Sequence, residues 1–186
     1  MVKETSGTGW DIRLASNSRQ LVKIVIIIGI VYAAAHAVLF SLRFALATEF
    51  PVVVVQGTSM IPTYYEGDLI LVKGVADSND IQLQAVIVFH SPYNWDTLII
   101  HRVVEKIETS EGIVLRTKGD NNPVRDPWTV QEEYVVGLVL QQIPYMGSVI
   151  TAIRSPLGAS IVFSLLILVI VVDFFYSKKE SSTRPL

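Results

Sequence analysis

The feature that most constrains this chain is a long uncharged stretch close to its N-terminus. Residues 24–42 are 19 consecutive positions without a charged side chain. A helix needs about 20 such residues to cross the hydrocarbon core of a bilayer, so the stretch predicts a transmembrane helix over residues 24–43. A cleaved signal peptide is the weaker interpretation, because its apolar part is usually only ~7–15 residues long. We interpret His36, inside this stretch, as a neutral imidazole near the interface or against a partner helix.

A second apolar stretch lies near the C-terminus. Residues 157–176 are apolar almost throughout and predict a second transmembrane helix. Basic residues flank the outer ends of both stretches, and cytoplasmic loops carry an excess of such residues. They are Lys3, Arg13, Arg19 and Lys23 before the first, and Lys178, Lys179 and Arg184 after the second. We therefore expect cytoplasmic tails at residues 1–23 and 177–186, with residues 44–156 on the outer face of a cell membrane and an endoplasmic-reticulum location less favoured.

Residues 44–156 have short apolar runs separated by turn residues, which is typical of a small all-β domain. The predicted strands cover residues 52–55, 69–72, 85–89, 98–105, 113–118 and 134–143, with turns at residues 76–80 and 108–112. The runs at 69–72 and 85–89 are continuously apolar, which favours strands buried on both faces. The fold class is therefore mostly β, with one small all-β domain flanked by two transmembrane helices.

Composition excludes several functions. The formal net charge is -2, which gives no indication of a nucleic-acid partner. The chain has no cysteine, so thiol catalysis, disulfides and thiolate metal sites are excluded. Neither a glycine-rich phosphate loop nor closely spaced metal ligands occur in the sequence. We expect no cofactor and no metal.

One serine is placed where a nucleophile would be exposed. The segment GTSMIPTYYEGD, residues 57–68, follows an apolar run, and Pro62 forces the chain out of the sheet within three residues of Ser59. Gly57 adds a point without a side chain two residues before it. The pattern predicts strand, exposed loop, turn and strand. On this geometry alone, such a residue is more often an ordinary loop serine than a nucleophile.

A serine nucleophile needs a base to remove its proton. His101 lies inside a predicted strand that would hold it steady, whereas His90 falls at a turn, where a solvated imidazole is expected. Lysine is the alternative base, and Lys73 and Lys118 are the candidates. Without a catalytic role, His101 would be a half-buried strand histidine, and the two lysines would be ordinary edge residues.

The segment KGDNNPVRDPW, residues 118–128, offers two carboxylates in one loop. Asp126 could reach the far nitrogen of His101, while Asp120 could support the serine loop or be the orienting carboxylate itself. A plain turn is the alternative, because Asp and Asn often bond to their own backbone.

Together these segments resemble those of type I signal peptidases, specifically the archaeal and endoplasmic-reticulum branch. GTSMIPTYYEGD resembles the serine box of that family, HRV at residues 101–103 its histidine box, and KGDNNPVRD its aspartate box, in the family's order. The resemblance covers about residues 20–145. It implies Ser59 as nucleophile, His101 as general base, Asp126 as third member and Asp120 as a supporting carboxylate.

The resemblance also implies a function: a membrane-anchored serine endopeptidase that cleaves signal peptides from secreted and membrane preproteins. Its partners would be those signal peptides, the lipid bilayer, and accessory membrane subunits or a secretion translocon. Many members carry a serine hydroxyl two residues before the nucleophile, where this chain has Gly57. Two alternatives stay open: a self-cleaving SOS-repressor-type Ser-Lys peptidase, and a non-catalytic membrane-tethered β module that binds secreted proteins.

Overall fold

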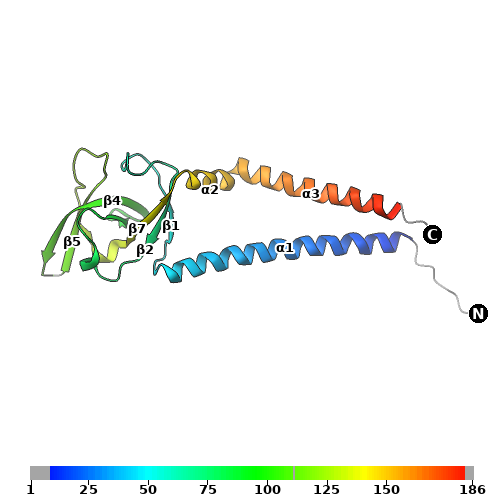
Figure 1. The fold of residues 1–186 in the computed structure, drawn as a ribbon, viewed down its shortest axis with the longest axis horizontal. Coiled ribbons are helices and arrows are strands. Elements are labelled where there is room, and N and C mark those ends of the chain that lie inside the picture. Colours follow the sequence, from blue (N-terminus) through cyan, green and yellow to red (C-terminus); the bar gives the residue numbers. More distant parts are fainter. Residues whose placement is uncertain (1–8, 111, 183–186) are drawn as a thin grey trace, which may run out of the picture. The chain divides into compact units, whose positions relative to one another are not determined.

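A computed structural model describes residues 9–110 and 112–182, with side chains described for residues 22–77, 79–110 and 112–172. The chain divides into two compact units. The unit Leu39–Gly158 contains all the described strands, and the residues before and after it form the other unit, whose described residues are helical (Figure 1). Residues 1–8 of the predicted N-terminal tail and residues 183–186 of the predicted C-terminal tail lie outside the described residues.

The strands form one antiparallel sheet. Its order is β1-β2-β7-β3-β4-β5-β6, and each neighbouring pair is antiparallel. The strands are β1 (Val52–Val54), β2 (Leu69–Lys73), β3 (Val86–Ser91), β4 (Asn94–Thr109), β5 (Gly112–Lys118), β6 (Val130–Gln131) and β7 (Val135–Ile143). Short 3₁₀ turns, η1 (Ser78–Asp80) and η2 (Glu132–Tyr134), precede β3 and β7. The mostly β fold predicted from the sequence is therefore confirmed for this unit.

Strand β3 lies in the middle of the sheet and is buried along its whole length. Successive side chains of a strand point to opposite faces, and those of β3 enter two different clusters. Ile87 and Phe89 belong to one cluster, while Val88 belongs to the other. The prediction of a strand buried on both faces is thus confirmed, although the strand begins at Val86 and extends to Ser91.

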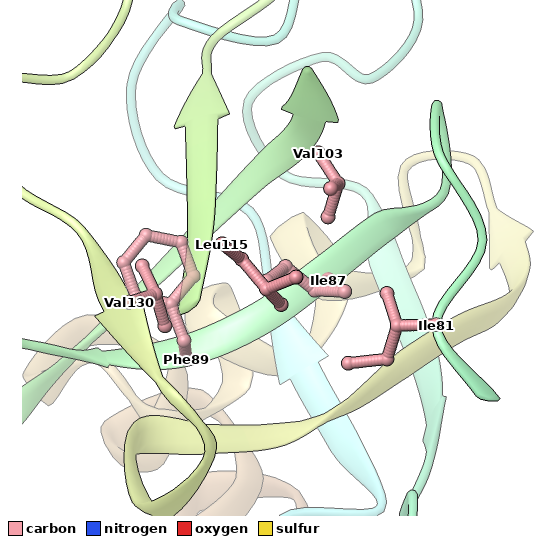
Figure 2. Packing of buried hydrophobic residues seen from close by; sticks show 6 residues of the cluster. All are labelled: Ile81, Ile87, Phe89, Val103, Leu115 and Val130. Carbon is pink, nitrogen blue, oxygen red and sulfur yellow. The ribbon is translucent and has the colours of Figure 1, made fainter. Parts of the chain in front are cut away.

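The two clusters form the core of the unit. Figure 2 shows the first, in which side chains from β3, β4, β5, β6 and the segment before β3 converge: Ile81, Ile87, Phe89, Val103, Leu115 and Val130. The second consists of Val55, Ile70, Val72 and Val88. It lies beside the start of the segment of residues 57–68, which we call the serine loop, because Val55 directly follows β1.

The largest differences from the predicted strands are in two places, while the boundaries of the other strands differ by one or two residues. Strand β4 is longer than residues 98–105 and pairs Thr109 with Gly112 of β5, so the expected turn at residues 108–112 is shorter. Strand β6 was not expected. It is a two-residue strand on the edge of β5, too short to give an alternating pattern in the sequence.

A helix that was not predicted lies between the last strand and residue 157. Helix α2 (Met146–Arg154) ends at Ser155, which has an extended backbone with ψ 156°, and α3 (Pro156–Ser182) begins at the next residue. Proline disfavours helical backbone in the residue before it and is well tolerated at the first helical position. The two helices consequently meet at an angle of 74°.

Helix α1 (Gly9–Ala45) contains the first predicted span. Within it, Val22–Ala45 is 24 residues long, apolar, and 0% buried in the protein, which is long enough to cross a membrane. Within the described residues, α2 and α3 satisfy the same criteria of length and composition only when taken together as a bent pair. One apolar helix near the N-terminus is therefore established.

Candidate active site

The loop between β1 and β2 holds Ser59. Its ends are closed by hydrogen bonds, from the Val55 N–H to the Asp68 carbonyl at 2.9 Å and from the Gly67 N–H to the Val55 carbonyl at 3.0 Å. Gly57 has a φ of 83°, a left-handed conformation that glycine adopts without steric strain. These features fix the path of the chain on both sides of Ser59.

His101 lies on β4, directly opposite Ile87 of β3. Its side chain is buried, with only 7% of the residue exposed, and its ring packs edge-on against Phe89 with the centroids 6.4 Å apart. Because β4 is paired on one side along β3 and on the other along β5 from Arg102 onward, the backbone that carries the imidazole is held by the sheet.

Three of the predicted site residues are brought together. The Nε2 atom of His101 lies 3.2 Å from Ser59 Oγ, and its Nδ1 atom lies 2.7 Å from Asp126 Oδ2. The Asp126 N–H donates to the Thr117 carbonyl at 2.9 Å, which fixes the carboxylate beside β5. Serine, imidazole and carboxylate thus form one continuous chain of hydrogen-bonding groups.

Asp120 has a different environment. Its carboxylate accepts hydrogen bonds from Arg102, at 2.8 Å from Nε and 2.6 Å from Nη2, and another from Thr63 of the serine loop. The hydrogen bond from Arg102 holds the pKa of Asp120 below its ordinary value, and the same pairing raises the pKa of Arg102. Of the two roles left open for Asp120, the geometry matches support of the serine loop.

One further partner of each aspartate was not predicted from the sequence: Thr117 for Asp126 and Arg102 for Asp120. Thr117 donates its hydroxyl to Asp126 Oδ2 at 2.6 Å and is itself 0% exposed. Arg102 directly follows His101 in the sequence, which indicated that it lies near the site. The alternation of side chains along β4, however, does not indicate which loop Arg102 contacts. Thr117 carried no signal, because a threonine inside a strand is an ordinary occurrence.

Gly119 permits the close approach of these groups. A Cβ atom added there would lie 2.7 Å from the Ser59 carbonyl oxygen and 2.9 Å from His101 Nε2. Real side chains do not tolerate such distances. The absence of a side chain at residue 119 therefore lets the loop of residues 118–128, the aspartate loop, pack over the serine and the imidazole.

A groove of about 540 Å³ leads to Ser59 and His101. Residues from β1 and from the first half of β4 form its sides, and Met60 lies at the serine end. Both strands have an unpaired edge among the described residues: β1 pairs only with β2, and β4 pairs only with β3 up to His101. The groove can therefore receive an extended peptide.

The other candidate bases lie elsewhere. Lys73 is at the exposed end of β2, and Lys118, on β5, is opposite Arg102 of β4. In the described part of the chain, no hydrogen bond joins either lysine to Ser59.

The expectation of a solvated His90 is wrong. It is 9% exposed in β3, with Nδ1 2.5 Å from the Trp95 carbonyl and its ring stacked on Trp95, because β3 continues through Ser91. His36, in α1, has Nδ1 3.0 Å from the Tyr32 carbonyl oxygen and its ring 4.1 Å from that of Tyr32.

Comparison with known proteins places these features in a family. The profile of the family described as "Signal peptidase, peptidase S26" matches residues 19–112, which include Ser59 and His101. The chain belongs to this family of hydrolases, and the resemblance identified from the sequence is confirmed.

Individual relatives agree. The chain is 32% identical over 141 residues to the human "Signal peptidase complex catalytic subunit SEC11C", which covers 72% of each chain. It is 33% identical over 124 residues to SEC11 of Schizophyllum commune, covering 54% of this chain and 63% of that relative. Signal peptidase I W of Bacillus subtilis is 38% identical over 77 residues, or 41% of this chain and 40% of the relative. The SEC11 matches support the endoplasmic-reticulum and archaeal branch.

Proposed function

We propose that this chain is a membrane-anchored serine endopeptidase that removes N-terminal signal peptides from secreted and membrane preproteins. The observation that carries the proposal is the linked contact of Ser59, His101 and Asp126, at 3.2 Å and 2.7 Å. Membership of the signal peptidase family supports the substrate class.

His101 is the general base in the proposed reaction. Asp126 accepts a hydrogen bond from the Nδ1–H, which leaves Nε2 free to accept the proton of the Ser59 hydroxyl. As this proton moves, Ser59 Oγ attacks the scissile carbonyl carbon and forms a tetrahedral oxyanion. When the intermediate collapses, the carbon–nitrogen bond breaks and His101 gives the proton to the departing amine.

Water completes the reaction. His101 Nε2 takes a proton from a water molecule, whose oxygen attacks the acyl carbon and displaces Ser59 Oγ, and the proton returns to Ser59. Thr117, by donating to Asp126 Oδ2, holds the carboxylate in place throughout. Asp120 acts at a distance, because it joins Arg102 on β4 to Thr63 in the serine loop.

The substrate lies extended in the groove. Its main chain pairs with the open edges of β1 and β4, and the groove between them admits small side chains near the cleavage site.

The proposed topology has two spans. Residues 24–43 and 157–176 cross the membrane, residues 1–23 and 177–186 are cytoplasmic tails, and residues 44–156 form the peptidase domain on the outer face of the cell membrane. The apolar helix Val22–Ala45 supports the first span, and the exposed apolar side chains of α3 as far as Val172 support the second. Partners are preprotein signal peptides and the bilayer, with accessory membrane subunits as in the complexes for which the SEC11 relatives are named.

The nucleophile provides the test. Ser59→Ala should reduce cleavage of a preprotein by roughly 10⁴-fold or more, because the remaining groups cannot form an acyl-enzyme. Cleavage is measured with the full chain in detergent, and Ser110→Ala, a change at an exposed turn serine, is the matched control. Undiminished cleavage by a folded Ser59→Ala protein contradicts the proposal.

A further inference from the structure

One exposed residue of the aspartate loop, Asn121, forms hydrogen bonds with the backbone on both sides of the Ser59 Cα atom. Its backbone N–H donates to the Ser59 carbonyl at 2.8 Å, and its side-chain amide donates to the Thr58 carbonyl at 3.1 Å. The second bond joins residues 63 positions apart in the sequence. A single residue therefore holds the two peptide groups that flank the Ser59 Cα atom.

Holding these carbonyls also fixes the direction of two N–H groups. A trans peptide group is planar, with its carbonyl and its N–H pointing in opposite directions. Because the Thr58 carbonyl points toward Asn121, the Ser59 N–H points away from the aspartate loop, and the Met60 N–H is directed in the same manner by the Ser59 carbonyl. Neither N–H donates to another protein group in the described part of the chain.

A free, fixed N–H beside a serine nucleophile matches the requirement for stabilising an oxyanion. Such donors are effective when they are oriented before the reaction, so that no reorganisation is needed as charge develops. Gly57, with its φ of 83°, contributes no hydroxyl, so backbone donors have to supply this stabilisation. The groove reaches Ser59 and Met60, while the aspartate loop does not line it.

We propose that Asn121 is a positioning residue, whose side-chain amide aims the Ser59 N–H at the oxyanion. The inference rests on the proposed function, because it requires that Ser59 attack a carbonyl. Asn121 touches no reacting atom. It acts by preventing rotation of the peptide group between Thr58 and Ser59, a task for which the hydrogen bond from the Ile61 N–H to the Thr58 carbonyl, at 3.3 Å, gives only partial support.

The expected effect is a loss in kcat without a loss in substrate binding. Complete removal of one oxyanion donor typically costs ~10²–10³-fold in kcat. Asn121→Leu removes the side-chain donor but leaves the Ser59 N–H present and less well oriented. We therefore expect kcat to fall by about 10-fold to 10²-fold, with KM changed less than about twofold.

The experiment compares Asn121→Leu and Asn121→Asp with the unmodified full chain in detergent. A carboxylate has nearly the shape of the amide but cannot donate. Two inhibitors separate positioning from structure: a peptide boronate, which forms a tetrahedral adduct with a serine, and an unreactive peptide of the same sequence. Affinity for the boronate should fall in parallel with kcat, while affinity for the unreactive peptide stays unchanged. Val124→Ala, an exposed position in the same loop, should behave as the unmodified chain.

Two results overturn the inference: full kcat in Asn121→Leu, or equal losses of affinity for both inhibitors. If Asn121→Leu fails to fold, Asn121→Asp carries the same test. Failure of the proposed function is recognised separately, because Ser59→Ala would then retain cleavage. An inactive Ser59→Ala together with a fully active Asn121→Leu rejects only the role of Asn121.

Discussion

Asp120 and Asp126 lie in one loop but bind different partners. Asp126 is 5% exposed and contacts His101 and Thr117, whereas Asp120 contacts Arg102 and Thr63. A carboxylate that is hydrogen-bonded to a histidine base holds the imidazole in the reactive tautomer. A carboxylate that is hydrogen-bonded to an arginine of another segment holds the two segments together. The two substitutions should therefore have different kinetic signatures.

Asp126→Asn should lower kcat by roughly 10⁴-fold, because an amide at this position favours the wrong tautomer of the imidazole. Asp120→Asn should have a smaller effect on kcat and should lower the melting temperature of the domain, because it weakens the contact between Arg102 and the serine loop. Steady-state kinetics and thermal unfolding of both variants, measured side by side, check this. A larger loss of kcat in Asp120→Asn would reverse the two roles.

At the scale of elements, Asp68 joins the serine loop to the last strand and α2. Its buried carboxylate accepts hydrogen bonds from the Tyr65 N–H at 2.8 Å, the Tyr145 N–H at 3.1 Å, and the Gln142 side chain of β7. Burial acts to raise the pKa of Asp68, but these hydrogen bonds outweigh it, and the pKa is lowered. The charged carboxylate therefore stabilises the junction of these elements.

The sign of this shift predicts how stability depends on pH. Because the pKa of Asp68 is lower in the folded state than the ~3.9 of an unfolded chain, its contribution is complete above that value and is lost as pH falls through the folded pKa. Asp68→Asn should destabilise the protein at pH 7 by roughly 2 kcal/mol. The difference between variant and unmodified chain should shrink below about pH 4. Denaturant unfolding at several pH values measures it, and a difference that grows on acidification contradicts the assignment.

Much of the sheet and three site residues could be predicted from the sequence. Runs such as residues 69–72 and 85–89 are governed by local pattern, and the turn residues around Ser59 show where the chain leaves the sheet. The contacts that complete the site are not local. Thr117, in β5, and Asn121, in the loop that follows, act through contacts between distant segments, and the close approach at Ser59 and His101 depends on Gly119. His90 is buried because β3 continues through Ser91, where a turn was expected. Helix α2 had no capping signal in the sequence, because Tyr145 precedes it where Ser, Thr, Asp or Asn would be usual, and no side chain caps the helix.

For the whole molecule, the proposed topology predicts which parts are accessible from each side of the membrane. Protease added to right-side-out vesicles should cleave within residues 44–156 and spare tags at both termini, because only the peptidase domain lies outside. Opening the vesicles should expose both tags. Cleavage of the C-terminal tag alone in intact vesicles would show that residues 157–176 do not cross the membrane, whereas cleavage of both would invert the orientation.

The open edges of β1 and β4 also determine what kind of inhibitor this site favours. An edge strand offers a row of backbone donors and acceptors at a spacing of about 3.3 Å per residue, whatever the side chains are. A ligand that carries two such rows, one on each side of a rigid extended backbone, would engage both strands at once. Its selectivity would come from backbone geometry, which substitutions in the groove alter least, so resistance by single substitution would be difficult to acquire.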